Sequence, residues 1–334
     1  MIQIKFVKGK CEILETPPPV LGKGANFDVL VKVLFSGLCG SDIHRIKNFQ
    51  QNKLSIPTLG HEIVGVVEDS KSTQFSKGDF VVIMPIINCS NCINCKEGHS
   101  QFCENPFTIG KNTDGGFSEY LLVPGKSLYK IDKPIKEYVL TDSFACVLHT
   151  ENLIGKFKNK KICIIGDGAI SEIAVRYFSL TNKIVNLVKN MPEGADKYGK
   201  RIRSNNNRII KTYSNYFDVV FECVGGNSPD LINFSVDLLN VGGKLVVLGV
   251  YDKDFYSNIY LSNLFYKEIQ MVGANSFIVN DNVNEFKDSL TFIKNNQLIF
   301  SDIITHELPL SKFNEGIEIF KNKQLSMAKK IVFF

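Results

Sequence analysis

The stretch KICIIGDGAISEIAVRYFSL, residues 161–180, decides the fold of the second half of the chain. It opens with a short run typical of a fully buried β-strand, turns at Gly166 and Gly168, and continues as an amphipathic helix from Ala169 to Leu180. The first glycine permits a tight turn. The second lets a pyrophosphate approach the backbone at the helix N-terminus, whose partial positive charge attracts anions. The combination of strand, turn and helix predicts a dinucleotide-binding site.

Buried strands recur at residues 184–188, 217–222, 244–249 and 269–274, and helical stretches such as 229–239 lie between most of them. This alternation predicts a parallel, doubly wound sheet of the Rossmann type, whose ligands bind outside the carboxyl ends of the strands. Ordinary turns are the alternative explanation for the glycines at these ends. The candidate dinucleotide contacts are Gly166, Gly168, Ala169, Ile170, Lys189, Cys223, Val224, Gly225, Leu248, Gly249 and Val250.

Two residues depart from the usual dinucleotide fingerprint. Ser171 stands where the third glycine is expected, a small change that close helix–strand packing can absorb. Lys189 follows the second strand, where NAD enzymes carry an acid for the ribose 2′-hydroxyl. Because a lysine can pair with a 2′-phosphate, the sequence favours NADP(H) over NAD(H); a solvated surface lysine is the alternative.

Length and composition limit the classes of function. The chain has 334 residues, enough for two domains, and its 44% apolar and 22% charged residues are those of a globular protein. The net charge of +5 comes from dispersed Lys and Arg, which argues against a nucleic-acid partner. Neither a membrane-spanning run nor a signal-peptide start is present, and nine cysteines, five of them in metal-like settings, favour a reducing compartment. We therefore expect a cytoplasmic protein.

The first 140 residues contain short β-type runs, at 27–35, 63–68 and 79–86, which predict a small all-β, barrel-like unit. A run of four cysteines follows within residues 88–104, with the spacing C-x2-C-x2-C-x7-C. Four thiolates this close can bind one tetrahedral zinc ion, which predicts a closed structural site. An iron–sulfur motif would place the fourth cysteine three residues on and before a proline, and a disulfide pair is the other alternative. The four are Cys89, Cys92, Cys95 and Cys103.

Two further motifs, GLCGSDIH at 37–44 and GHE at 60–62, complete a pattern. With the four cysteines and the glycine-rich turn, they resemble the zinc-containing medium-chain alcohol dehydrogenases over essentially the whole chain, including ITH at 304–306 and FNEG at 313–316. The resemblance implies a GroES-like catalytic domain, residues 1–143 and 276–334, interrupted by a Rossmann domain, residues 144–275.

The same resemblance implies a catalytic zinc ion in addition to the structural one. Cys39 and His61 match the first two ligands of the family, and Asp142 stands at the place of the third. An N-cap role is the alternative for Asp142, and the thiolate of Cys146 is an alternative ligand. Glu62 would support the ligands or exchange with one of them, and Asp42 would orient His61 through its other ring nitrogen.

The implied reaction is hydride transfer between an alcohol and a nicotinamide. Zinc would lower the pKa of the alcohol, and the proton would leave through the Ser41 hydroxyl and the cofactor ribose to His44. His44 is assigned because it stands two residues after Asp42 in the motif, whereas His99, His149 and His306 are expected to be structural. Lys329 aligns with a family basic residue that can approach the pyrophosphate, and a solvated lysine is equally expected.

The substrate is expected to be a small polyol or sugar phosphate. The stretches 37–46 and 114–120 resemble polyol dehydrogenases, particularly the galactitol-1-phosphate type, and the short nucleotide-binding region resembles NADPH-dependent ribulose-5-phosphate reductases. Arg45 could meet a substrate phosphate, or it is an exposed helix arginine. The family is usually dimeric or tetrameric through edge pairing of its Rossmann sheets, for which strand 269–274 is available.

Two other functions remain open at this point. A zinc-independent quinone or enone reductase shares the nucleotide site but needs neither Cys39 nor His61. A regulatory descendant that binds zinc and nucleotide without turnover is the second.

Overall fold

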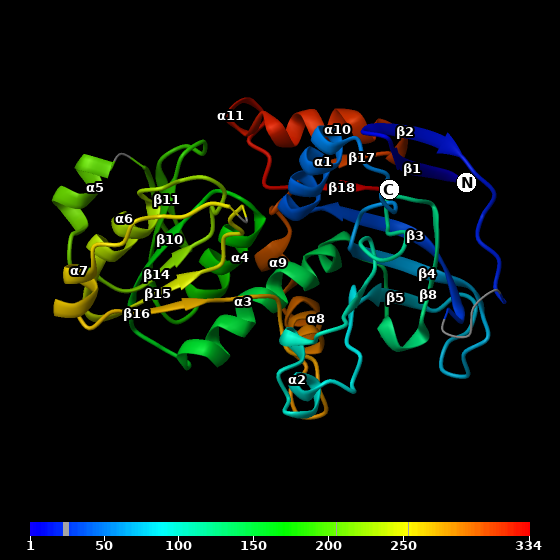
Figure 1. The fold of residues 1–334 in the computed structure, drawn as a ribbon, viewed down its shortest axis with the longest axis horizontal. Helices are drawn as coiled ribbons and strands as arrows, with labels where there is room; N and C mark the ends of the chain where they lie inside the picture. The colour runs from blue at the N-terminus through cyan, green and yellow to red at the C-terminus, as the bar shows by residue number, and fades with distance from the viewer. Residues whose placement is uncertain (23–26, 205, 253) are drawn as a thin grey trace. The chain divides into compact units, whose positions relative to one another are not determined.

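The computed structural model describes residues 1–22, 27–204, 206–252 and 254–334, and the chain forms two compact units. Unit 1 comprises Met1–Asp142, Ile278–Asn322 and Lys330–Phe334, and unit 2 comprises Ser143–Phe277 and Lys323–Lys329. The chain therefore passes from one unit to the other four times (Figure 1). Among the described residues, no helix combines the length and apolar character needed to cross a membrane.

Unit 1 is built around a seven-stranded sheet with the order β17-β18-β3-β4-β5-β9, in which β8 also pairs with β3. All pairs are antiparallel except β17 with β18. Apolar residues of β3, β4, β5 and β8 form its core. The strands are β3 (Val29–Leu38), β4 (Glu62–Ser70), β5 (Phe80–Ile83), β8 (Tyr120–Val123), β9 (Leu128–Ile131), β17 (Ile304–Leu308) and β18 (Lys330–Phe333).

Short elements complete unit 1. The hairpin of β1 and β2 turns through Lys8 and Gly9, which both have positive φ, as a tight two-residue turn requires. The remaining strands and helices are β1 (Ile2–Val7), β2 (Lys10–Glu15), β6 (Ile86–Ile87), β7 (Phe107–Thr108), α1 (Gly40–Asn52), α2 (Ile93–Lys96), α8 (Glu285–Asn295), α9 (Gln297–Phe300) and α10 (Phe313–Lys321). The 3₁₀ turns are η1 (Ser100–Phe102), η2 (Gly125–Ser127), η3 (Lys136–Leu140) and η4 (Leu310–Lys312).

Unit 2 contains a second seven-stranded sheet, with the order β12-β13-β11-β10-β14-β15-β16. All its pairs are parallel except β12 with β13, and the predicted doubly wound α/β sheet is confirmed. The strands are β10 (Lys161–Ile165), β11 (Lys183–Val188), β12 (Gly194–Asp196), β13 (Gly199–Arg203), β14 (Phe217–Glu222), β15 (Leu239–Val247) and β16 (Gln270–Gly273). The helices are α4 (Ala169–Phe178), α5 (Asn206–Tyr213), α6 (Leu231–Leu238), α7 (Leu261–Tyr266) and α11 (Lys323–Ser326), and α3 (Thr141–Ile154) begins in unit 1 and continues into unit 2.

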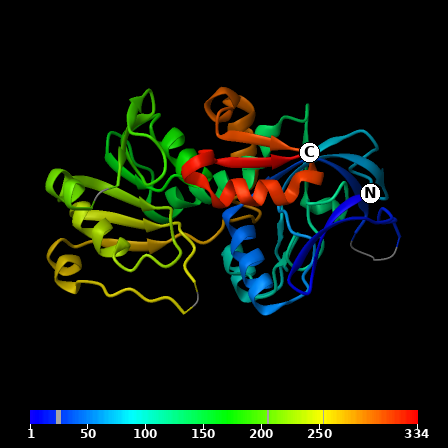
Figure 2. The same ribbon diagram turned by 90° about the horizontal axis from the view of Figure 1, so that it is seen from above.

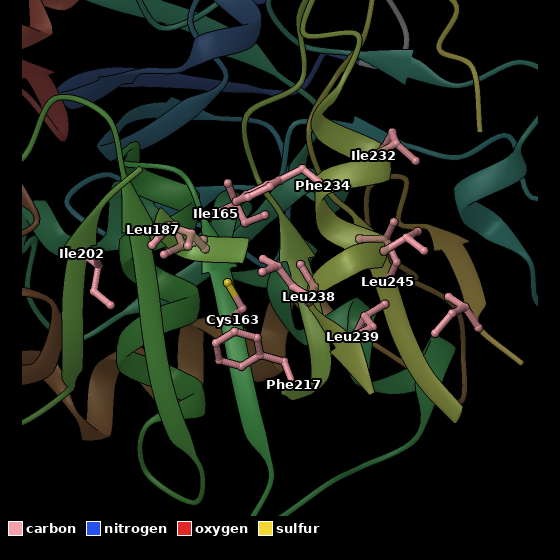
Figure 3. Packing of buried hydrophobic residues seen from close by; sticks show 14 residues of the cluster. Cys163, Ile165, Leu187, Ile202, Phe217, Ile232, Phe234, Leu238, Leu239 and Leu245 are labelled. Atoms are coloured by element: carbon pink, nitrogen blue, oxygen red, sulfur yellow. The ribbon is translucent and has the colours of Figure 1, made fainter. Parts of the chain in front are cut away.

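The core of unit 2 explains why its strands read as continuous apolar runs. Cys163 and Ile165 of β10 lie among buried side chains of β11, β14, α6 and β15, such as Leu187, Phe217 and Leu238 (Figure 3). Helices cover a parallel sheet on its faces, so its central strands are apolar throughout. The connection from β11 to β13 differs from the usual pattern, because the short strand β12 stands there in place of a crossover helix. Figure 2 shows the ribbon of Figure 1 turned by 90°, with the strands and helices of unit 2 mainly in green and yellow.

Candidate functional site

The four cysteines of the 88–104 lobe converge. Their sulfur atoms all lie within 4.8 Å of one another, as four ligands of one ion require. The Sγ atoms of Cys89 and Cys95 are 4.0 Å apart, close to the roughly 3.8 Å between sulfurs of a tetrahedral zinc site and far from the roughly 2 Å of a disulfide. Backbone N–H groups of Asn91 and Cys92 lower the pKa of the Cys89 thiol to about 6, whereas burial raises the pKa of the Cys95 thiol to about 12. The lobe fits a zinc ion.

The second candidate metal site lies where two neighbouring strands and a helix of unit 1 meet. Cys39 connects the end of β3 to helix α1, and His61 precedes β4, which is the antiparallel neighbour of β3. One donor atom each from Cys39, His61 and Glu62 falls within 4.8 Å of the others. A thiolate, an imidazole and a carboxylate are ordinary zinc ligands, so this set also fits the ion.

Asp42 orients His61. Its Oδ1 lies 3.3 Å from His61 Nδ1, and its Oδ2 accepts a hydrogen bond of 3.1 Å from the backbone N–H of Cys39. Burial alone would lower the pKa of His61, but the nearby Asp42 carboxylate outweighs it and raises the pKa well above its usual range. With Nδ1 facing this carboxylate, Nε2 is the nitrogen available to a metal.

Two carboxylates compete for the third ligand position. Glu62 belongs to the 4.8 Å group, whereas Asp142, the predicted ligand, lies outside it with Oδ2 3.9 Å from His61 Nε2. Burial raises the pKa of Asp142 to about 6. Asp142 begins the first turn of α3, and Cys146, the alternative ligand, lies further along this helix in unit 2. The assignment of Asp142 stays a prediction.

Lys330 is a site residue that the sequence analysis missed. It is 1% exposed, and its Nζ lies 2.6 Å from both carboxylate oxygens of Glu62. Pairing of β18 with β3 places it there, because Ile331 is the partner of Leu38, the residue before Cys39. Burial opposes the charge of Lys330, but Glu62 outweighs this and raises the pKa of the lysine. The available signal was a lysine at the start of the otherwise apolar strand KIVF.

The predicted relay and substrate residues lie on the first two turns of α1. Ser41 is half-buried and His44 is exposed. Arg45 donates a hydrogen bond from its guanidinium to the carbonyl of Gly110, so part of its hydrogen-bonding capacity is already used. The catalytic roles of Ser41, His44 and Glu62 and the phosphate-binding role of Arg45 stay predictions.

The glycine-rich turn of unit 2 adjoins a cavity of about 550 Å³. Gly166 has φ +139°, and Gly225 has φ +63° with the Val250 carbonyl oxygen 2.3 Å from where a Cβ would stand, so neither position accepts a side chain readily. Three of the predicted cofactor contacts line the cavity: Gly166, Lys189 and Val224. The others surround the same strand ends outside the lining: Gly168, Ala169, Ile170, Cys223, Gly225, Leu248, Gly249 and Val250.

The turn is joined to the end of β11 through Asp167. Its Oδ2 accepts hydrogen bonds from the backbone N–H groups of Lys189 (3.3 Å) and Asn190 (2.8 Å) and from the Asn190 side-chain amide (2.9 Å). The sequence analysis assigns no role to Asp167. The feature that could have pointed to it is the charge between the two glycines of the turn.

A buried glutamate on α4 lies close to three cationic side chains. The Glu172 carboxylate lies 3.5 Å from Arg176, 3.1 Å from Arg201 and 3.2 Å from Lys329. Lys329, which the resemblance associates with the pyrophosphate, is therefore paired with Glu172 in this structure. The i, i+4 spacing of Glu172 and Arg176 was the only part of this cluster visible along the sequence.

Two family models match the chain. The alcohol dehydrogenase GroES-like domain matches residues 25–133, and the zinc-binding dehydrogenase model matches residues 172–295.

Full-length relatives agree with these matches. The L-threonine 3-dehydrogenase of Caldanaerobacter subterraneus subsp. tengcongensis is 27% identical over 94% of this chain and 93% of its own length. That of Shewanella woodyi is 28% identical over 93% of each. Among solved structures, galactitol-1-phosphate dehydrogenase from Escherichia coli has a TM-score of 0.84 at 21% identity, covering 100% of this chain and 99% of that one.

A zinc-binding dehydrogenase from Sinorhizobium meliloti, described as putative and bound to NADP, has a TM-score of 0.83 at 23% identity over 100% and 98% of the two chains. Both resemblance and fold class are thus confirmed. The chain belongs to the zinc-dependent medium-chain alcohol dehydrogenase family and is an NAD(P)-dependent enzyme that acts on alcohols.

Proposed function

We propose that this enzyme transfers a hydride between NADP(H) and the secondary hydroxyl carbon of a polyol or sugar phosphate. The observation that carries the proposal is the convergence of Cys39, His61 and Glu62 on one point, with Asp142 beside His61. When bound, zinc supplies Lewis acidity toward a hydroxyl oxygen and the nicotinamide supplies the hydride acceptor. The protein supplies the ligands, their orientation and a route for the proton.

Each residue of the set has a distinct task in this proposal. Cys39 and His61 would hold the ion, and Asp142 is the third ligand that we propose. Asp42 fixes the ring of His61 by facing Nδ1, which leaves Nε2 as the nitrogen that would bind the ion. Lys330 neutralises Glu62, which limits the negative charge around the ion.

The proton route uses α1. The Ser41 hydroxyl accepts the proton of the substrate hydroxyl and passes a proton on toward His44. His44 is exposed, so its imidazole can release the proton to water. Arg45 is the proposed contact for a substrate phosphate, with the part of its guanidinium that Gly110 does not use.

The substrate class is supported by the fold neighbours, whose names include galactitol-1-phosphate dehydrogenase and L-idonate 5-dehydrogenase, both from Escherichia coli. A second candidate is L-threonine, because curated relatives at 27–28% identity are L-threonine 3-dehydrogenases. Threonine also carries a secondary hydroxyl, so the same ligand set serves both. NADP(H) is proposed because Lys189 lines the nucleotide cavity.

We also propose a homodimer that pairs β16 of two copies. β16 is an edge strand of the unit 2 sheet, and edge strands offer unpaired backbone groups to another chain. Exposed apolar side chains accompany it on and around α7, including Phe265 (75% exposed) and Tyr266 (79% exposed). Such a patch is typical of an association surface.

The test begins with zinc quantification and continues with a cofactor-reduction screen. NAD⁺ and NADP⁺ are offered in parallel with polyols, their phosphates, L-threonine and simple alcohols. Two zinc ions per chain and highest activity on a polyol or its phosphate support the proposal. Highest activity on simple alcohols refutes the substrate class, and highest activity on L-threonine establishes the second candidate. One zinc ion or none per chain contradicts the proposed catalytic site.

A further inference from the structure

The carboxylate of Asp167 lies within the phosphate-binding turn but bonds elsewhere. Its Oδ2 accepts three N–H groups, all from the two residues that follow β11. The turn and β11 are also joined through the backbone, because the N–H of Gly166 donates to the Leu187 carbonyl at 2.9 Å. The Lys189–Asn190 segment is thus fixed to the turn at several points.

The cavity shows what this segment can reach. Gly166 and Asp167 line it on the turn, Lys189 and Asn190 line it after β11, and Ser204 lines it after β13. Lys189 is the one lysine in this lining among the described residues, and its side chain is exposed. A dinucleotide that places its pyrophosphate at the turn has its adenosine ribose at the end of the second strand, next to Lys189.

A negative charge at this place needs an explanation, because a carboxylate repels a 2′-phosphate. The three hydrogen bonds to Oδ2 give one. They are directed at the protein's own backbone and at Asn190, and charge-assisted bonds of this kind fix a loop. The carboxylate therefore acts on the segment that carries the lysine.

We propose that Asp167 is a positioning residue for dinucleotide selectivity, which holds Lys189 where it can pair with a ribose 2′-phosphate. This inference rests on the NADP(H) preference proposed above. It adds that selectivity depends on a residue of the pyrophosphate turn. The turn and the ribose end of the cavity are then energetically coupled.

The experiment measures binding of 2′,5′-ADP and 5′-AMP to the full chain by calorimetry. These fragments differ in the 2′-phosphate and need neither substrate nor metal, so the result does not depend on turnover. The variants are K189A, D167A, D167N and the double variant K189A/D167A. D196A is the matched control, because Asp196 also accepts a backbone N–H, that of Tyr198, but lies outside the cavity lining.

We expect the unaltered chain to bind 2′,5′-ADP about tenfold more tightly than 5′-AMP, the effect of one charged contact. K189A should remove this preference. D167A should reduce it to about threefold or less, D167N should retain more of it than D167A, and D196A should leave it unchanged. In the K189A background, D167A should change the ratio by less than about twofold, because there is no lysine left to position.

Four results would overturn the inference. A larger preference for 2′,5′-ADP in D167A would mean that the carboxylate opposes the 2′-phosphate and binds the ribose hydroxyl. An unchanged ratio in D167A, or an equal effect of D167A with and without Lys189, would mean that Asp167 does not act through the lysine. No preference in the unaltered chain would refute the NADP(H) proposal together with this one, whereas the first three results refute this one alone.

Discussion

Lys330 and Glu62 form an ion pair from which water is excluded, beside the residues proposed to bind the catalytic zinc. Removing one partner of such a pair leaves the other charge buried without compensation, which typically costs about 3–5 kcal/mol of unfolding free energy. Replacing both partners by neutral groups costs much less, because no charge remains to be desolvated.

We therefore expect K330M to lower the free energy of unfolding by about 3–5 kcal/mol and the double variant K330M/E62Q to recover most of this loss. Urea unfolding measures both. The control is K312M, since Lys312 pairs with Glu315 at an exposed site. Equal stability of K330M and K312M, or no recovery in the double variant, would show that the pair is not coupled.

Cys39 gives a prediction about metal content. C39S should lose the catalytic ion and retain the structural one, so that zinc falls from about two ions per chain to about one, and turnover should fall by at least about 100-fold. Elemental analysis and the cofactor-reduction assay measure the two effects. C146S tests the alternative third ligand. If C146S loses the catalytic zinc, the third ligand is Cys146 and not Asp142.

The residues that sequence reasoning identified are those with a local signature. Cys39, His61 and the four lobe cysteines stand in short motifs, and the glycine turn follows its own strand. Lys330 could not be found in this way, because its partner lies 268 residues away and only the pairing of β18 with β3 brings them together. The cluster of Glu172 with Arg201 and Lys329 could not be predicted for the same reason, because its members are far apart in the sequence.

At the scale of elements, the 88–104 lobe consists of the short helix α2, the 3₁₀ turn η1 and loops. A four-residue helix has no stability of its own in water, so the lobe depends on the ion that its thiolates bind. C95S should therefore lose the structural zinc and expose residues 88–104 to protease, while K96A should do neither. Limited proteolysis with mass spectrometry locates the cuts. A resistant lobe in zinc-free C95S would contradict this account.

The edge strand β16 and helix α7 give a second prediction at this scale. A charge in the exposed apolar patch should oppose association, so F265D should shift the protein from dimer to monomer in analytical ultracentrifugation. L298D is the matched control, since Leu298 is even more exposed (85%) but lies on α9 of unit 1. Dissociation by both variants, or by neither, would argue against this surface.

Helices and strands with a clear apolar pattern were predictable from the sequence, whereas the segments that connect them were less so. Strands β10, β11, β14 and β16 lie within one residue of their predicted positions, because strands covered on both faces are apolar throughout. The strand predicted at 244–249 is longer: β15 begins at Leu239, inside the stretch predicted to be helical, and ends at Val247. The helix predicted to reach Leu180 ends at Phe178. Nothing in the sequence indicated β12, whose three exposed residues pair only with β13. A short exposed strand has no apolar pattern to detect.

At the scale of the whole molecule, unit 1 is assembled from three separate pieces of the chain, and residues 330–334 are the last of them. β18 lies between β17 and β3, so its removal would leave β17 without its strand partner, β3 without one of its neighbours and Glu62 without its cation. A chain that ends at Lys329 should therefore lose zinc bound by Cys39 and His61, while unit 2 should retain 5′-AMP binding. Calorimetry and metal analysis distinguish the two. A control chain that lacks only Phe334 should behave as the full chain.

The interior position of β18 also determines when the sheet of unit 1 can be completed during translation. Translation has to proceed through 268 residues after Glu62 before Lys330 of β18 is made, so β3 waits for this neighbour during synthesis and their pairing closes a long loop. Contacts between such distant segments form slowly, and partially assembled sheets meanwhile attract other nascent chains. We therefore expect unit 1, more than unit 2, to require chaperone assistance.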